Sequence, residues 1–289
     1  EDYGTSKSWM LTEGDEENRV YVQYRDNVGN WSAATSDTII LNRISPIVKL
    51  LVEKGRILPD GEIVGVIPDT GMEARFSKVM DGISVSEGLK LVALRDNLNR
   101  AINEEVSLNF EWDGSTKTAR MNPKTGELKK NYLYRLRVSD RVRDLAGNTV
   151  KGERELIFRT IMEHTKKNIV VKATNERLIV TLEVNALKED GYLIINTEPL
   201  TYQFEINPEV IILANEKSMT NRWYPIEGCL WEIKACKKSG DWIEDNFGSE
   251  VKITFPYDEK GVVGNTAIPL SEETLMAFWL NEEDSNWVK

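Results

Sequence analysis

The sequence predicts an all-β protein built from consecutive β-sandwich domains. Short runs with an apolar side chain at every second position recur along the chain, as in "RVYVQYRD" and "NYLYRLRVSD", and this period of two is typical of strands with one buried face. The phrase Asp-x-x-Gly-Asn follows both runs. No segment shows a helical period over about twelve residues, and 289 residues suffice for two or three domains.

The repeated phrase predicts a hairpin turn. It occurs in "RDNVGNWS", which begins at Arg25, and in "RDLAGNTV", which begins at Arg143. An Asp side chain accepts a hydrogen bond from the backbone two residues on, Gly takes a positive φ without steric cost, and Asn tolerates the left-handed region. Calcium would need more oxygen ligands than such a loop offers, so no metal is expected. The predicted turn residues are Asp26, Gly29, Asn30, Asp144, Gly147 and Asn148.

The spacing of the phrase predicts tandem domains. Its two aspartates lie 118 positions apart, at 26 and 144, which suits one sandwich of ~100 residues and a linker. Polar or Pro-containing junctions near Arg43 and Met162 divide the chain into residues 1–43, 44–162 and 163–289. Because such junctions usually bury little surface, we expect the domains to unfold separately.

The last part of the chain carries further alternating runs and a group of aromatic residues. Its predicted strands are "RLIVTLEV", "GYLIIN", "EVIILA", "LWEIKA", "VKITFPY" and "LMAFWL", and "LSEETLM" is a candidate helical turn. Cys229 and Cys236 flank "LWEIKA". If that run is extended, the two sulfurs lie too far apart to bridge, so we expect them to pack as small apolar side chains.

Composition disfavours several classes of function. A net charge of -10 spread along the chain repels phosphate backbones, so nucleic acid is not an expected partner. No apolar run approaches the ~18 residues that span a bilayer, so no membrane insertion is expected within this segment. The one histidine, His164, lies in a predicted junction, and no hydrolase, phosphate-binding or metalloprotease motif occurs. We therefore expect no enzymatic activity, no catalytic residue and no cofactor.

Four phrases of the central part are similar to a known family. "LPDGEIVGV", "ARFSKVMD", "NPKTGELKKNYLYRLRVSD" and "RDLAGNTV" with "LIFRT" occur in order between Ile44 and Met162. Together they resemble the S-layer-type bacterial Ig-like domain, in which Phe-Ser-x-x-Met-Asp ends an early strand and an Asp-x-Ala-Gly-Asn turn joins the last two. The resemblance implies an Ig-like sandwich with a spacer or display role, at the surface of a bacterium or outside it.

The two flanking parts resemble other domains of bacterial surface proteins. Residues 1–43 are similar to the closing hairpin of a related Ig-like repeat, so we expect an incomplete domain there. Residues 163–289 are similar to ZU5-like β-sandwiches through "VIILANEKSM", "FGSEVKITFPYDEKG" and "LSEETLMAFWLNEEDSNWVK", and this domain is expected to be cut short. Many such domains have an acidic stretch at the position of Asp258 to Gly261, where Lys260 disfavours calcium. The chain is expected to be a piece of a longer protein, and any dimer formed through its hairpin would result from truncation.

These observations predict a non-catalytic structural or spacer segment of a secreted or cell-surface bacterial multidomain protein. The alternative is an adhesion or carbohydrate-binding module whose partner is a protein or glycan at the cell surface. Five of the eight tryptophans lie in the last part, and exposed aromatic rings stack on sugars or anchor protein interfaces. The candidate ligand-binding residues are Trp223, Tyr224 and Trp242.

Overall fold

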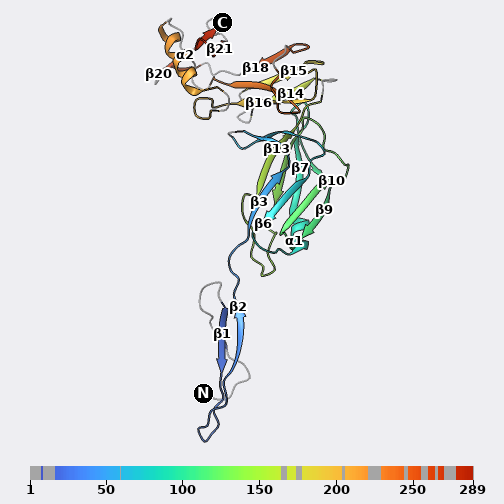
Figure 1. Cartoon of the computed structure of the whole chain (residues 1–289), viewed down its shortest axis with the longest axis vertical. Helices are drawn as coiled ribbons and strands as arrows, with labels where there is room; N and C mark the ends of the chain where they lie inside the picture. The colour runs from blue at the N-terminus through green and yellow to red at the C-terminus, as the bar shows by residue number, and fades with distance from the viewer. Residues whose placement is uncertain are drawn as a thin grey trace.

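The computed structural model describes residues 8, 17–58, 60–163, 168–173, 178–203, 206–220, 229–243, 247–254, 260–263, 266–269 and 278–288. An N-terminal hairpin, a central sandwich and a C-terminal domain follow one another along the long axis of the molecule (Figure 1). Strands dominate all three parts, which confirms the predicted all-β class. Among the described helices, none is long and apolar enough to cross a membrane.

The central domain consists of two facing sheets. One has five strands in the order β12-β3-β6-β10-β9, and the other has six in the order β4-β5-β13-β11-β7-β8. A short helix, α1 (Gly82–Gly88), joins β6 to β7. The strands are β3 (Ile47–Val52), β4 (Arg56–Ile57), β5 (Ile63–Val66), β6 (Met72–Phe76), β7 (Leu89–Arg95), β8 (Ala101–Val106), β9 (Leu108–Asp113), β10 (Thr118–Pro123), β11 (Leu133–Val138), β12 (Lys151–Gly152) and β13 (Glu155–Thr160).

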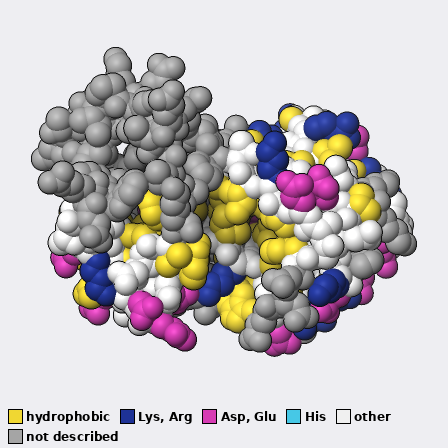
Figure 2. Space-filling model, turned by 90° about the horizontal axis from the view of Figure 1, so that it is seen from above, with side chains coloured by type: hydrophobic (Ala, Val, Ile, Leu, Met, Phe, Trp, Pro, Cys, Tyr) yellow, Lys and Arg dark blue, Asp and Glu magenta, His cyan; other side chains and the backbone are white. Residues whose placement is uncertain are grey.

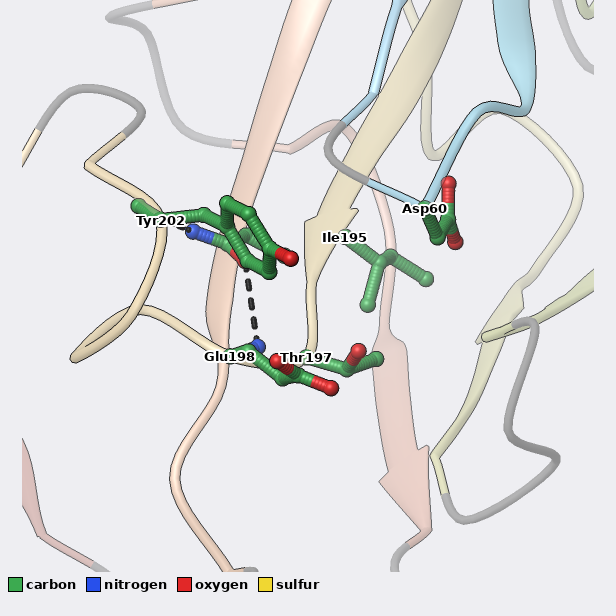
Figure 3. Close-up of a pocket in the computed structure, with 6 residues that line it drawn as sticks. Asp60, Ile195, Thr197, Glu198 and Tyr202 are labelled. Atoms are coloured by element: carbon green, nitrogen blue, oxygen red, sulfur yellow. Dashed lines mark hydrogen bonds between the residues drawn. The ribbon is translucent and has the colours of Figure 1, made fainter.

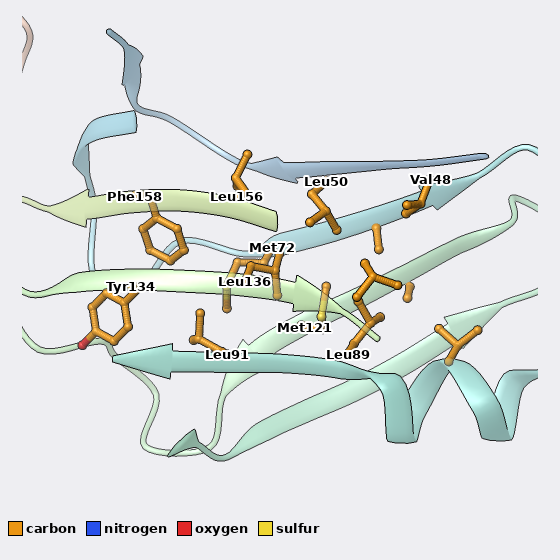
Figure 4. Packing of buried hydrophobic residues seen from close by; sticks show 14 of the residues in the cluster. Val48, Leu50, Met72, Leu89, Leu91, Met121, Tyr134, Leu136, Leu156 and Phe158 are labelled. Atoms are coloured by element: carbon orange, nitrogen blue, oxygen red, sulfur yellow. The ribbon is translucent and has the colours of Figure 1, made fainter. Parts of the chain in front are cut away.

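The core of this domain lies between the two sheets, where alternate side chains of facing strands meet (Figure 4). On β11, Tyr134, Leu136 and Val138 are buried, as the period of two predicts. They face the buried Leu50 of β3 and Met121 of β10, among others. Full burial of each such side chain contributes roughly 1.5–3 kcal/mol, so this core is large enough to hold the domain together.

The N-terminal hairpin consists of β1 (Glu17–Val22) and β2 (Thr35–Ile40), paired antiparallel. The C-terminal domain has smaller sheets in the orders β14-β15-β18, β16-β17, β19-β20 and β21-β22, and one helix. Its elements are β14 (Ile169–Lys172), β15 (Ile179–Leu182), β16 (Gly191–Asn196), α2 (Pro208–Thr220), β17 (Glu232–Lys237), β18 (Val251–Thr254), β19 (Lys260–Val263), β20 (Thr266–Pro269), β21 (Trp279–Asn281) and β22 (Asn286–Val288).

One strand prediction in the C-terminal domain is wrong, because "EVIILA" lies in helix α2. Asn207 precedes the helix, and its Oδ1 accepts the backbone N–H of Glu209 at 2.9 Å. Pro208 supplies a fixed φ at the first helical position, which suits a helix start. Ile211 and Ala214, three positions apart, form the buried stripe. "LSEETLM" lies outside the described residues.

The junction after β13 contradicts the expectation of little buried surface. Ile161 and Met162 follow the last central strand directly, and each is only 1% exposed. Met162 and Gly191 exchange backbone hydrogen bonds of 2.7 and 3.2 Å, which ties this segment to the start of β16. A buried cluster spans the two domains and consists of Leu58, Val64, Ile161, Tyr192, Ile194 and Cys236. The central and C-terminal domains are therefore packed together, and the boundary near Met162 stays a prediction.

Candidate functional site

In a predicted spacer, the candidate functional sites are the contacts that connect the central domain to the segments on either side of it. The Asp144 loop is the first of these. The carboxylate of Asp144 is buried and accepts the backbone N–H groups of Ala146 and Asn148, each at 2.9 Å. The side-chain amide of Asn148 donates to the same carboxylate at 2.9 Å. Gly147 has a φ of 89°, as the turn interpretation requires, so the loop is closed by its own backbone and side chains.

The Asp26 loop has the same geometry at the tip of the N-terminal hairpin. Its carboxylate accepts the N–H groups of Val28 at 3.0 Å and of Asn30 at 2.8 Å, and the Asn30 amide at 2.9 Å. Gly29 has a φ of 98°. The residues beside the two loops pair in the same way, Arg25 with Trp31 and Arg143 with Thr149.

A third loop of this kind joins β7 to β8 and was missed in the sequence. Asp96 in "RDNLNR" accepts the N–H groups of Leu98 at 3.0 Å and of Arg100 at 2.8 Å. Asn99 stands where the other loops have glycine, with a φ of 60°. Arg100 takes the place of the final Asn and donates its Nε to the carboxylate at 2.6 Å. The phrase that could have revealed it is Arg-Asp-Asn, which "RDNVGN" shares with "RDNLNR".

The Asp144 loop holds the linker that enters the central domain. Nδ2 of Asn148 donates to the carbonyl oxygen of Asn42 at 2.8 Å. Lys78 donates to the side chain of the same Asn42 and, at 2.7 Å, to the carbonyl of Ile44. Lys78 belongs to the phrase "FSKVMD", whose Met80 is buried and bridges to Asp144. The phrases "FSKVMD" and "RDLAGNTV" therefore lie side by side at the point where the linker enters the central domain.

The Asp96 loop lies at the other end of the domain and contacts the C-terminal domain. The carbonyl oxygen of Asn97 accepts the backbone N–H of Val170, in β14, at 3.1 Å. The same oxygen accepts Nδ2 of Asn131 at 3.0 Å, which fixes the carbonyl from within the central domain. One type of loop thus contacts the incoming linker at one end and the outgoing domain at the other.

Polar and close apolar contacts complete the junction between the central and C-terminal domains. Lys130 donates to the carboxylate of Asp190 at 3.0 Å, and this hydrogen bond is the main reason that the pKa of Lys130 is raised. Gly65 has a φ of 74°, and a Cβ built there would lie 2.8 Å from the ring of Tyr192. Only glycine therefore fits between the backbone of β5 and this ring.

A shallow pocket opens beside this junction (Figure 3). Asp60 of the central domain contributes one wall, and the end of β16 with the following turn contributes the rest. Asn196 is buried there and organises the turn, because its Nδ2 donates to the carbonyl of Tyr202 at 2.9 Å while its Oδ1 accepts the N–H of Glu198 at 3.1 Å. Asp60 and Glu198 are the two acidic residues that line this pocket.

Of the predicted ligand-binding residues, only Trp242 lies in a described segment. It is half-buried against the interdomain cluster. The guanidinium of Arg56 lies 5.1 Å from its ring centroid, and Nζ of Lys234 lies 5.2 Å from it. Trp242 thus already contacts cations from both domains. Trp223, Tyr224 and His164 lie outside the described residues.

Charges on the C-terminal end of the molecule are of both signs. Figure 2 shows Lys and Arg side chains close to Asp and Glu side chains on this face, with apolar side chains toward its middle. Cys236 is buried and Cys229 is partly buried, and neither forms a disulfide. Within the described ranges, no three side chains of His, Cys, Asp or Glu lie close enough together to hold a metal ion.

The buried loop carboxylates are held in the ionised form. Burial raises the pKa of Asp144, but the hydrogen bonds from Asn148 and Ala146 and the nearby charge of Lys78 outweigh it, so the pKa lies below its ordinary value. For Asp96, burial likewise opposes the hydrogen bonds from Arg100 and Leu98, and the pKa is again lowered. In each loop, hydrogen bonds from the loop's own N–H groups therefore stabilise the ionised carboxylate.

Comparisons with known proteins agree with this architecture in the central domain. Residues 56–160 match the family model of the bacterial Ig-like domain. This range contains the Asp96 and Asp144 loops and the phrase "FSKVMD". A search of curated proteins gave no match. The ZU5-like character of residues 163–289 stays a prediction.

The chain is also similar to solved structures of a bacterial surface protein. The N-terminal part of the bacterial S-layer protein SbsC is 15% identical, with a TM-score of 0.28 over 53% of this chain and 35% of that one. The S-layer protein rSbsC(31-844) is 12% identical, with a TM-score of 0.27 over 79% of this chain and 34% of that one. The chain thus covers about a third of the length of each of these structures.

The geometry of the Asp144 loop predicts how position 147 tolerates substitution. Gly147→Val should destabilise the protein by about 1–3 kcal/mol, because a β-branched residue is strained at positive φ. No heavy atom lies within 4 Å of a Cβ built there, so the main expected cost is backbone strain. Gly147→Asn should cost less than half as much, since Asn99 occupies this place in the Asp96 loop. Urea unfolding measures both, and equal losses would contradict the account.

Calcium provides a second test of the same loops, because a turn closed by its own N–H groups needs no ion. Added calcium should leave the melting temperature of the protein unchanged. A rise with calcium that Asp144→Asn abolishes would overturn the interpretation of the loop as a turn alone.

The lowered pKa of Asp144 predicts a specific acid response. A carboxyl with a depressed folded pKa contributes stability that is present above its unfolded pKa of about 3.9 and is lost as pH falls through the folded value. Asp144→Asn should therefore lower stability at pH 7 by about 1–3 kcal/mol, and its difference from the wild type should shrink below about pH 4. Thermal unfolding from pH 7 to pH 2.5 measures this. Asp140→Asn, at an exposed aspartate, is the control and should leave the acid response unchanged.

Proposed function

We propose that this chain is a non-catalytic spacer of a bacterial surface protein, in which the central and C-terminal domains form one stiff unit. The match of residues 56–160 to the bacterial Ig-like domain supports the surface role. The observation that carries the proposal is the buried cluster across the junction, to which both domains contribute three side chains. A spacer must keep its two ends at a fixed separation, and a packed junction supplies that.

The contacts at the junction limit both bending and rotation. The backbone bridge between Met162 and Gly191 lies at the end of β13, while the bond from Val170 to Asn97 anchors β14 at a second point. The ion pair of Lys130 with Asp190 adds a third attachment. Attachments at several separate points resist rotation about any one of them, whereas inter-domain interfaces that are small leave the domains free to move.

Trp242 fits this role through its contacts. Its ring contacts a central-domain cation, Arg56, and a C-terminal-domain cation, Lys234. Partly desolvated cation–π contacts are worth roughly 0.5–2 kcal/mol each. We infer that Trp242 secures the rim of the junction and that a surface glycan is not its partner.

A substitution at Gly65 tests whether the central and C-terminal domains form one stiff unit. Gly65→Ala should push the Tyr192 ring away and loosen the junction while both cores stay folded. Backbone ¹⁵N relaxation measures the rotational correlation time of each domain. In the wild type the two times should be equal, and in Gly65→Ala the two should differ because the domains tumble partly independently.

Gly147→Ala is the matched control for this variant. Gly147 has a similar positive φ of 89°, but no atom lies within 4 Å of a Cβ placed on it, so the variant carries the strain of about 1–2 kcal/mol without the clash. Its two correlation times should stay equal. Unequal times in the wild type would overturn the stiff-spacer proposal.

Protease shaving of intact cells of the source bacterium tests the surface location, since a surface segment is cleaved without lysis.

A further inference from the structure

The chain enters the central domain through β3 and leaves it through β13. β3 begins at Ile47, at the end of the linker, and β13 ends at Thr160, directly before the buried junction residues Ile161 and Met162. The linker and the junction lie at opposite ends of this domain (Figure 1). A pull on the two ends of the chain therefore draws β3 by its N-terminal end and β13 by its C-terminal end, in opposite directions.

The last strand of the domain is divided between the two sheets. β12 and β13 are separated in the chain by Glu153 and Arg154 alone. β12 pairs parallel with the start of β3 in one sheet, and β13 pairs with β11 and β5 in the other. Between them, the carbonyl of Arg154 accepts the backbone N–H of Val138 at 2.8 Å. One continuous segment thus joins the entry strand to the sheet through which the chain leaves.

Gly152 is the last residue of this segment that pairs with β3. Its φ is 100°, in the region that favours glycine. A Cβ built there would lie 2.9 Å from the carbonyl oxygen of Val48 and 3.1 Å from Cγ2 of Ile47, so a side chain would push the segment away from β3. One residue earlier, Lys151 donates its backbone N–H to the carbonyl of Pro46 at 2.8 Å.

The direction of a pull decides how the hydrogen bonds between these strands are loaded, because the bonds of a β-ladder run across the strands. When parallel neighbours are pulled from opposite ends, they slide past each other and all of the bonds carry the load together. When the neighbours are pulled from the same end, the bonds break one after another. β3 and β12 are parallel, so tension between the chain ends loads their bonds together.

We propose that the central domain bears tension along the chain, and that residues 151–160 are the clamp that holds its entry strand to its exit. This inference rests on the proposed spacer function, because a spacer of a surface protein transmits every pull on the part that it carries. The stiff junction resists bending of the two domains, whereas the clamp resists unfolding of the central domain along one direction.

Single-molecule force spectroscopy on the full chain tests this direction. In the first arrangement the chain is held at its two termini, which loads β3 and β12 in shear. In the second it is held at the N-terminus and through an azidophenylalanine that replaces Leu145, a 75% exposed residue of the loop that holds the linker. Both handles then act at the entry end of the domain, and β3 and β12 are peeled apart from that end.

Because the force at which a domain opens reports its unfolding rate along the pulled path, we expect the opening force between the termini to be at least about twice that between the N-terminus and position 145. In the first arrangement the central domain is recognised by a length gain of about 40 nm, at roughly 3.5 Å per residue. Equal forces would overturn the clamp but not the stiff spacer, whose correlation times are measured without load.

Gly152→Ala tests whether the pairing of β12 with β3 is the source of this difference. In this variant the two forces should become equal, because the added Cβ separates the strands. Gly126→Ala is the matched control, since Gly126 has a φ of 86° and no atom within 4 Å of a Cβ built there, and it should keep the wild-type ratio of forces. A wild-type ratio in Gly152→Ala would overturn the assignment of the clamp.

Discussion

The carboxylate of Asp144, buried and surrounded by N–H groups, is the constraint on which the entry into the central domain depends. It closes its loop through the backbone of Ala146 and Asn148 and thereby orients the Asn148 side chain. That side chain is then free to donate its remaining N–H to Asn42, the first anchored residue of the linker. An unpaired buried carboxylate would cost several kcal/mol, so loop and linker are coupled to one ionised group.

The same device at the opposite end of the domain explains how a single sandwich can hold both the incoming linker and the domain that follows. In the Asp96 loop the carboxylate again holds the turn. The group that contacts the neighbouring domain is the backbone carbonyl of Asn97, which accepts a hydrogen bond from the N–H of Val170 in β14. A donor at one end and an acceptor at the other are both presented by rigid turns and not by long side chains. Because turns are short and their hydrogen bonds are internal, neither contact requires much ordering of the loop when the neighbour packs against it.

How far the sequence predicts this structure depends on how local each feature is. The Asp-Gly-Asn turns and the strands with period two follow from neighbouring residues, and "GYLIIN" coincides with β16. Helix α2 was also encoded locally, in Asn207, Pro208 and Glu209, but the β-branched residues Val210, Ile211 and Ile212 favour a strand and hid the helix signal. The Asp96 loop escaped because Asn replaces Gly at its positive-φ position. The junction was not predictable, since Val64 and Ile194 are 130 positions apart in the sequence and meet only through the tertiary fold.

The two ends of the central domain differ in the kind of interaction that holds them, and this difference determines where the molecule bends. Toward the C-terminal domain, apolar side chains such as Ile161 and Ile194 are withdrawn from water across the junction, and separating the domains would expose them at a cost of roughly 25 cal/mol per Å². Toward the hairpin, the linker is held by hydrogen bonds to the carbonyls of Asn42, Ile44 and Pro46, while Ile44 itself is 61% exposed. Such bonds contribute only about 0.5–1.5 kcal/mol each, because water replaces them. Every one of these anchors also lies on the central-domain side of Leu41. We therefore expect bending between the modules to be concentrated between β2 and Asn42, with the central and C-terminal domains moving as the one stiff unit proposed above.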